Sequence, residues 1–269
     1  MRDFDRSALA LFAEEFRAAR EKAALSRDDL SSKINYSVSL VAKVEDMDRV
    51  PQADFAARCD EALDTPGTFT RMQKRLRSLS FPAAFRPFAE YESAAISLRT
   101  FEHSLVPGLL QTPDYARAVL ATRPNTSEGQ LDELVTARLE RQVILERDNP
   151  PLLWVLVDEA VLHREVGDQQ IIQGQLKHLA ETSRRPNITI QVVPFSAGAH
   201  SGLRGSFIIA EFKEAPSAVY LATAADGETT EDPSEVAKIS LTFDTLRSEA
   251  LTRRASRDLI MRVTEDQWK

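Results

Sequence analysis

The first 65 residues contain no glycine and a single proline, Pro51, so this stretch lacks the residues that most often interrupt helices. Apolar side chains recur there at three- and four-residue spacing, as in Leu9, Phe12 and Phe16. That periodicity predicts an amphipathic first helix over about 7–24. The region is therefore expected to be a set of short, closely packed helices.

Start and stop signals divide the next segment into helices. Ser26 and Asp29 have the spacing of a capping box, which predicts a second helix from about residue 27. That helix should end near Asn35, because asparagine tolerates the left-handed conformation of a tight turn. Ser37 can cap a third helix that runs to about Glu45, and Pro51 fits the first turn of a fourth.

Beyond residue 63 the composition changes, and we assign three regions. Residues 1–67 form an all-α domain, 68–88 form a basic linker helix followed by a proline-containing linker, and 89–269 form an α+β domain. The α+β domain is expected to contain a small sheet of about four strands flanked by helices. A helix is predicted over about 90–100, a parallel pair of strands at 152–157 and 188–192, and a hairpin from 206–212 and 218–222.

Composition limits the class of protein. At 43% hydrophobic and 28% charged residues, the 269-residue chain is typical of a globular protein of two domains. No apolar run approaches a membrane span, the N-terminus has no apolar leader, and Cys59 is the single cysteine. We expect a cytoplasmic protein with no membrane partner, no disulfide, no metal and no cofactor.

Charge is not concentrated in a basic block. Residues 1–79 hold 14 Lys and Arg against 14 Asp and Glu, and residues 80–269 carry the whole net charge of −7. DNA binding would therefore depend on a local basic surface on a shaped element.

The strongest functional pattern is a helix-turn-helix over residues 25–45. In such a motif one helix crosses the phosphate backbone and the next presents short side chains to the major groove. Val41 and Val44 should face inward. The residues predicted to meet base edges or phosphates are Ser37, Val38, Ser39 and Ala42, with Arg27, Lys33, Lys43 and Arg49 as cationic contacts. A purely structural helical bundle is the alternative.

Several segments resemble a known family. Residues 25–30, 37–45 and Pro51 are similar to the lambda-repressor and Cro type of helix-turn-helix, called XRE. The rest of the chain resembles actinobacterial XRE regulators that carry a dedicated C-terminal domain. The segments that carry this second resemblance are 98–102, 106–118, 138–142, 158–163, 175–179, 193–195 with Gly198 and His200, and 250–260.

The resemblance implies a homodimeric, DNA-binding transcriptional regulator of the Scr1-like, antitoxin-like kind, often encoded beside a small partner protein. Three positions depart from the usual pattern: Arg27 and Val38 stand where glutamine is common, and Met47 where glycine commonly ends the third helix. A polar contact at the DNA backbone is then missing, and the turn at 46–49 must be built differently. Asp46 and Asp48 also weaken the local positive field, so we expect specific binding without tight non-specific binding.

Signals for other chemistry are weak. Glu159 and His163 could form part of a metal site, but no third ligand is evident, so we interpret His163 as a salt-linked or core histidine. We interpret His178 as a packed histidine. The acidic run at 226–232 lacks EF-hand spacing and indicates a solvated turn. The loop at 194–205 holds three of the nine glycines together with His200 and Arg204, so it is either a ligand-covering loop or a plain connection.

No nucleophile elbow, phosphate-binding loop or dinucleotide fingerprint is present, so we expect no catalytic residues and no enzyme. The preferred interpretation is a homodimeric transcriptional regulator that binds operator DNA, with a C-terminal domain that senses a small-molecule effector or a small partner protein. The alternative is an antitoxin-like protein-binding module for which DNA binding is secondary.

Overall fold

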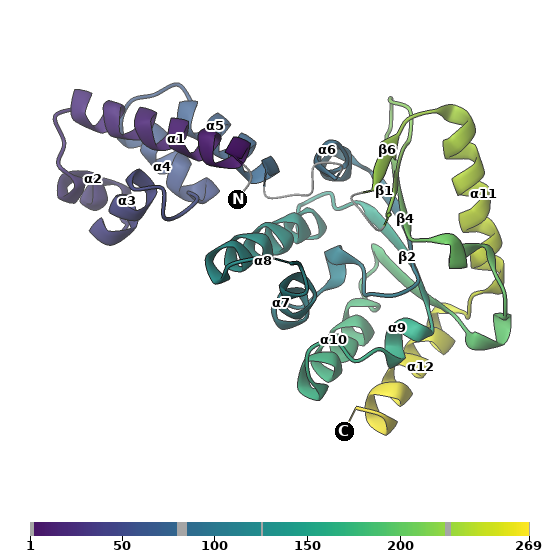
Figure 1. The fold of residues 1–269 in the computed structure, drawn as a ribbon. Helices are drawn as coiled ribbons and strands as arrows, with labels where there is room; N and C mark the ends of the chain where they lie inside the picture. The colour runs from purple at the N-terminus through teal and green to yellow at the C-terminus, as the bar shows by residue number, and fades with distance from the viewer. Residues whose placement is uncertain (1–2, 80–84, 125, 224–226, 269) are drawn as a thin grey trace. The chain divides into compact units, whose positions relative to one another are not determined.

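The computed structural model describes residues 3–79, 85–124, 126–223 and 227–268 (Figure 1). The chain folds into two compact units, Met1–Phe81 and Pro82–Lys269, and each is described by itself. Residues 80–84 of the predicted linker and Asp226 of the predicted acidic turn lie outside the described residues.

The first unit is built from helices alone within its described residues. The helices are α1 (Asp3–Lys22), α2 (Arg27–Ile34), α3 (Val38–Glu45), α4 (Ala53–Ala62) and α5 (Thr68–Leu79). The predicted order of helices is confirmed, with one correction at the fourth. Gln52 is the N-cap of α4, so Pro51 precedes that helix and does not lie in its first turn.

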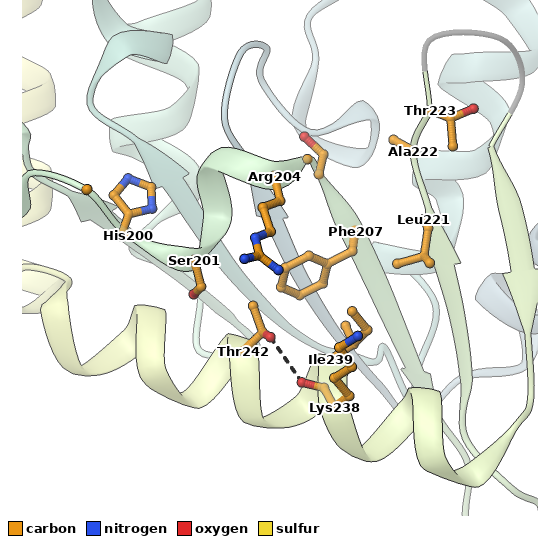
Figure 2. A pocket seen from close by; sticks show the side chains of 13 residues that line it. His200, Ser201, Arg204, Phe207, Leu221, Ala222, Thr223, Lys238, Ile239 and Thr242 are labelled. Atoms are coloured by element: carbon orange, nitrogen blue, oxygen red, sulfur yellow. Dashed lines mark hydrogen bonds between the residues drawn. The ribbon is translucent and has the colours of Figure 1, made fainter.

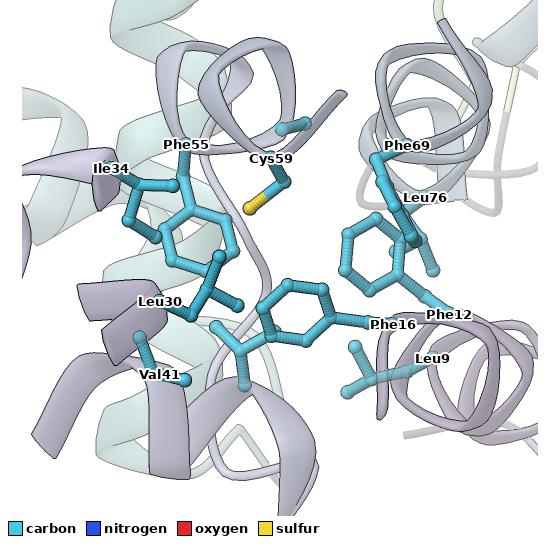
Figure 3. Packing of buried hydrophobic residues seen from close by; sticks show 12 residues of the cluster. Leu9, Phe12, Phe16, Leu30, Ile34, Val41, Phe55, Cys59, Phe69 and Leu76 are labelled. Atoms are coloured by element: carbon cyan, nitrogen blue, oxygen red, sulfur yellow. The ribbon is translucent and has the colours of Figure 1, made fainter. Parts of the chain in front are cut away.

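Aromatic packing forms the centre of the first unit (Figure 3). The Phe16 ring meets Phe55 at 5.5 Å and Phe69 at 5.7 Å between ring centroids, both in edge-to-face geometry. Phe69 and Leu76 are buried in this cluster, so α5 packs into the unit instead of extending from it as a linker. Its cations Arg71, Lys74 and Arg75 face solvent.

The second unit contains one six-stranded sheet in the order β3-β2-β1-β4-β5-β6. The strands are β1 (Ser97–Glu102), β2 (Leu152–Asp158), β3 (Ile188–Val193), β4 (Phe207–Glu211), β5 (Ala218–Leu221) and β6 (Glu228–Thr230). Strands β1, β2 and β3 pair in parallel, whereas β4, β5 and β6 add antiparallel pairs on the other side of β1. The predicted parallel pair and hairpin are confirmed.

Helices cover both faces of this sheet (Figure 1). One face carries α11 (Pro233–Glu249), and the other carries α7 (Pro113–Ala121), α8 (Glu128–Gln142) and α10 (Gln169–Thr182). Phe243 and Leu246 of α11 pack on Phe101, Leu156 and Phe207 of the strands. The other described α-helices of the second unit are α6 (Arg86–Ala94), α9 (Ala160–His163) and α12 (Arg253–Asp266). The described 3-10 turns are η1 (Gly108–Leu110), η2 (Val143–Leu145), η3 (Phe195–Ala197) and η4 (Ser201–Arg204).

The prediction of about four strands was wrong, because the sheet has six. The helix predicted over 90–100 ends at Ala94, and β1 occupies Ser97–Glu102 at the centre of the sheet. Leu98 and Phe101 point to opposite faces and both are fully buried, so β1 gains more from central pairing than from a longer helix. Strand β6 is a polar edge strand with no apolar pattern to reveal it.

None of the described helices is long and apolar enough to span a bilayer. Among the described side chains, no group of three or more His, Cys, Asp or Glu is placed to hold a metal ion.

Candidate nucleic-acid interface

The turn between α2 and α3 has the caps that the sequence predicts. Ser26 and Asp29 form a reciprocal capping box at the start of α2. Asn35 ends α2 in the left-handed conformation, with φ 55°, and Ser37 Oγ accepts a hydrogen bond from the backbone N–H of Leu40 at the start of α3. These local bonds set the short three-residue turn that a helix-turn-helix requires.

Helix α3 is buried along one side and exposed along the other. Val41 and Val44 are fully buried, as predicted, and pack in the core of the first unit. Ser37, Val38, Ser39 and Lys43 are exposed and Ala42 is half-buried. The exposed start of α3 thus carries two hydroxyls and one small apolar side chain, which suit close approach to base edges and thymine methyl groups.

A buried carboxylate holds α3 in place on the side opposite its exposed surface. Glu45, at the end of α3, has a fully buried side chain that accepts hydrogen bonds from Arg20 Nε at 2.6 Å and Arg27 Nε at 2.7 Å. Burial alone would raise the pKa of the Glu45 carboxyl, but the two guanidinium groups outweigh it and hold the pKa below its ordinary value. Glu45 therefore ties α1, α2 and α3 together as an ion.

Arg27, which was predicted to contact phosphate, forms ion pairs within the first unit. Its guanidinium bonds Glu45 and, at 3.0 Å, Asp46. The hydrogen bond with Glu45 is the largest cause of the raised pKa of Arg27. The Arg27 guanidinium thus links α2 to the end of α3, and its Nε and Nη2 already donate hydrogen bonds to Glu45 and Asp46.

The three other predicted cations are exposed. Lys33 lies in the last turn of α2, Lys43 in the last turn of α3, and Arg49 in the connection to α4. Lys33 shares α2 with the acidic Asp28 and Asp29, and Lys43 and Arg49 are close in sequence to Asp46 and Asp48. The nearby carboxylates therefore confine the positive electrostatic potential to the immediate surroundings of these three cations.

The turn at 46–49 was expected to be built differently because Met47 replaces the usual glycine, but its backbone keeps the left-handed conformation. Met47 itself adopts a φ of 63°, the conformation that glycine would take with less strain. The backbone N–H groups of Asp48 and Arg49 both bond to the carbonyl of Lys43 and close the turn.

Glu45 and the Tyr36 cluster are the features of this surface that sequence reasoning missed. Tyr36 Oη donates to Asp54 at 2.9 Å, and the Arg58 guanidinium lies 5.6 Å above the Tyr36 ring. This cluster fixes the turn to α4. A signal for Glu45 was present, because it follows Val41 by four residues and so shares the buried side of α3, where a carboxylate needs a cationic partner.

The second unit has a separate cavity of about 750 Å³, bounded by η4, β4, β5 and α11 (Figure 2). His200 and Arg204, the two predicted ligand-binding residues, both line it. His200 Nε2 pairs with Asp158 Oδ2 at 3.0 Å, which anchors the imidazole to the end of β2. The structure thus brings the two predicted residues to one cavity.

The glycines of the 194–205 loop have conformational and packing roles. Gly198 and Gly205 have positive φ, and a Cβ on Gly202 would lie 2.3 Å from the Phe101 ring. Gly202 therefore lets η4 lie directly on β1, where it forms one wall of the cavity.

His163 and His178, the two other histidines that the sequence singled out, have contacts within the second unit. His163 Nε2 lies 3.7 Å from Glu159 Oε1, its Nδ1 lies 2.5 Å from Gln267 Oε1, and its ring stacks on Phe195. His178 lies on α10, where burial is the chief cause of its lowered pKa and Thr182 Oγ1 lies 3.4 Å from its Nε2.

Comparison with known families agrees with this division. Residues 11–71 match a helix-turn-helix domain, so the first unit defines a protein of the DNA-binding helix-turn-helix class. Residues 85–262 match a domain of unknown function, DUF5753, and the chain belongs to the family that carries this domain. No curated protein and no solved structure matches the chain.

Proposed function

We propose that the protein is a sequence-specific transcriptional regulator of the XRE type. The observation that carries this proposal is the exposed start of α3, with Ser37, Val38 and Ser39 on a helix whose other side is held by Val41, Val44 and the Glu45 ion pairs. A helix held this rigidly can present small side chains to base edges without losing further conformational freedom on binding.

The proposed mechanism uses two copies of the chain. A two-fold homodimer would place two α3 helices in successive major grooves, with half-sites about 34 Å apart. The resemblance to Scr1-like regulators supports a homodimer whose second unit controls DNA affinity through a small-molecule effector or a small partner protein. The proposal assigns no catalytic step to either unit.

Charge supports specific over non-specific binding. Residues 1–79 carry no net charge, and Arg27 is engaged by Glu45 and Asp46. Few phosphates can then be neutralised, which lowers both the non-specific affinity and the salt dependence of binding. Base contacts from α3 would have to supply the discrimination between duplexes.

The test is binding of the purified chain to its own promoter fragment and to a scrambled duplex, by fluorescence anisotropy over a salt series. Preference for the promoter at physiological salt is expected, and Ser39→Glu/Lys43→Glu should abolish it. Lys213→Glu/Ala215→Glu introduces the same charge change on an exposed loop of the second unit and should leave binding unchanged.

Two results would overturn the proposal. Retention of promoter binding by Ser39→Glu/Lys43→Glu would show that α3 is not the recognition helix. Equal affinity of the wild-type chain for both duplexes would instead make an antitoxin-like protein partner the principal target.

A further inference from the structure

The cavity between η4 and α11 combines an apolar floor with a cationic rim. Phe207, Leu221 and Ile239 supply apolar surface from β4, β5 and α11. Arg204 and Lys238 are exposed and come from η4 and α11, on two different walls of the cavity. Figure 2 shows Arg204 extending from η4 toward the helix that carries Lys238 and Thr242. Its volume of about 750 Å³ falls in the range of small-molecule sites.

Neither cation is neutralised within the part of the chain that the structure describes. The side chains of Arg204 and Lys238 have no ion-pair or hydrogen-bond partner among those residues. Arg99, which enters the neighbouring core from β1, differs from them because Glu211 lies 2.8 Å from it. Two unpaired cations on one cavity produce a positive potential that favours an anion.

His200, which also lines the cavity, supplies a second observation that does not depend on charge. The His200 side chain is 6% exposed, and its Nδ1 is buried without a hydrogen-bond partner among the described residues. The Nε2–H that donates to Asp158 leaves Nδ1 as an acceptor in the neutral ring. A buried acceptor without a partner costs stability and needs a proton donor, which a water bound together with the ligand supplies and an anionic group does not.

We propose that this cavity binds a small organic anion with an apolar body. Its carboxylate, sulfonate or phosphate group would lie between Arg204 and Lys238, and its hydrocarbon part on Phe207, Leu221 and Ile239. The binding site is a property of the second unit alone, whereas an effector role for the ligand rests on the proposed regulator function.

The test uses octanoate as the anionic probe and octan-1-ol as its neutral counterpart, titrated calorimetrically into the full-length chain without DNA. Octanoate should bind at least tenfold more tightly than octan-1-ol. Arg204→Gln/Lys238→Gln should weaken octanoate at least tenfold and leave octan-1-ol unchanged. Lys213→Gln/Arg254→Gln removes two exposed cations elsewhere in the second unit and should affect neither probe.

A third variant tests the location of the apolar part. Thr242→Phe adds a ring to the α11 wall of the cavity and should weaken both probes. Equal affinity for octanoate and octan-1-ol, unchanged octanoate binding in Arg204→Gln/Lys238→Gln, or no octanoate binding at millimolar concentration would each overturn the proposal. Because no DNA is present, these outcomes are separate from failure of the proposed regulator function.

Discussion

The carboxylate of Glu45, the last residue of α3, accepts a 2.7 Å hydrogen bond from Nε of Arg27, the first residue of α2. The other Glu45 oxygen accepts a 2.6 Å bond from Arg20 of α1. A single buried carboxylate thus joins three helices of the DNA-binding unit. The orientation of α3 within the first unit depends on these ion pairs as well as on apolar packing.

We expect Glu45→Gln to lower the free energy of unfolding of the first unit by about 3 kcal/mol, because Arg20 and Arg27 lose their buried partner. Urea denaturation followed by far-UV circular dichroism would measure the loss. Both tryptophans, Trp154 and Trp268, lie in the second unit, so tryptophan fluorescence provides an internal control that should not shift.

The same substitution should change the response to acid. The pKa of Glu45 is held below its ordinary value of 4.5, so its stabilisation is present above about pH 4.5 and is lost as pH falls through the folded pKa. The wild-type first unit should therefore destabilise in acid more steeply than the Glu45→Gln variant. Parallel acid titrations of the two chains would contradict the assigned ion pairs.

Lys43→Ala should weaken binding to the promoter and the scrambled duplex by the same factor. Under the proposed function Lys43 contacts phosphate, so its loss should reduce the slope of log affinity against log salt by about 0.9. Anisotropy titrations at several salt concentrations measure this slope, with Lys177→Ala on α10 as the control. An altered preference between duplexes at an unchanged slope would show that Lys43 contacts a base instead.

Met47→Gly should stabilise the first unit by about 1 kcal/mol, because glycine adopts the positive φ of this position with less strain. Thermal unfolding followed by circular dichroism would show a higher Tm. Asp48→Gly is the matched control at an exposed neighbour without positive φ, and it should not raise the Tm. Stabilisation by both variants would mean that backbone strain at Met47 is not the cause.

Gly202→Ala should destabilise the second unit by about 2 kcal/mol, because its Cβ would overlap the Phe101 ring and displace η4. Gly198→Ala is the comparison, since the space around Gly198 is open and only its positive φ is strained. Tryptophan fluorescence during denaturation should show the larger loss for Gly202→Ala. The opposite ranking would contradict the packing of η4 on β1.

Glu102→Gln should stabilise the second unit by about 2 kcal/mol at pH 8. Burial raises the pKa of Glu102 to about 7, although Ser206 and Arg138 partly oppose the shift. The folded chain then keeps a proton between about pH 4.5 and 7 that the unfolded chain has released, so wild-type stability falls as pH rises through this window. Denaturation midpoints in the variant should lose that slope, and an unchanged slope would assign it to another group.

The helix-turn-helix was predictable because its signals are local. Ser26, Asn35 and Ser37 each act on the backbone within a few residues, and Val41 and Val44 reveal the buried side of α3 by spacing alone. The role of Arg27 was not predictable in the same way. Its position at the start of α2 fits a phosphate contact, and only the fold brings Glu45 and Asp46 to it.

Strand β1 shows the limit of periodicity. Tyr91, Ala94, Ala95 and Leu98 recur at helical spacing, but the chain leaves the helix at Ala94. The decisive interactions are the pairings of β1 with β2 and β4, which come from distant sequence. Part of the cavity could be predicted, because His200 and Arg204 lie in one glycine-rich loop. Lys238 could not be assigned to it from the sequence, because it comes from a distant helix, α11, that only the fold brings to this loop.

The central position of β1 has a consequence for synthesis of the chain. Ser97 pairs with Leu152 of β2 and with Glu211 of β4. Because both partner strands come later in the sequence, β1 stays unpaired during synthesis until they have been translated. The five described helices of the first unit all lie before Phe81, in a compact unit of their own. The DNA-binding unit can thus finish folding during translation while the second unit still lacks a sheet, and nascent chains present α3 before any ligand cavity exists.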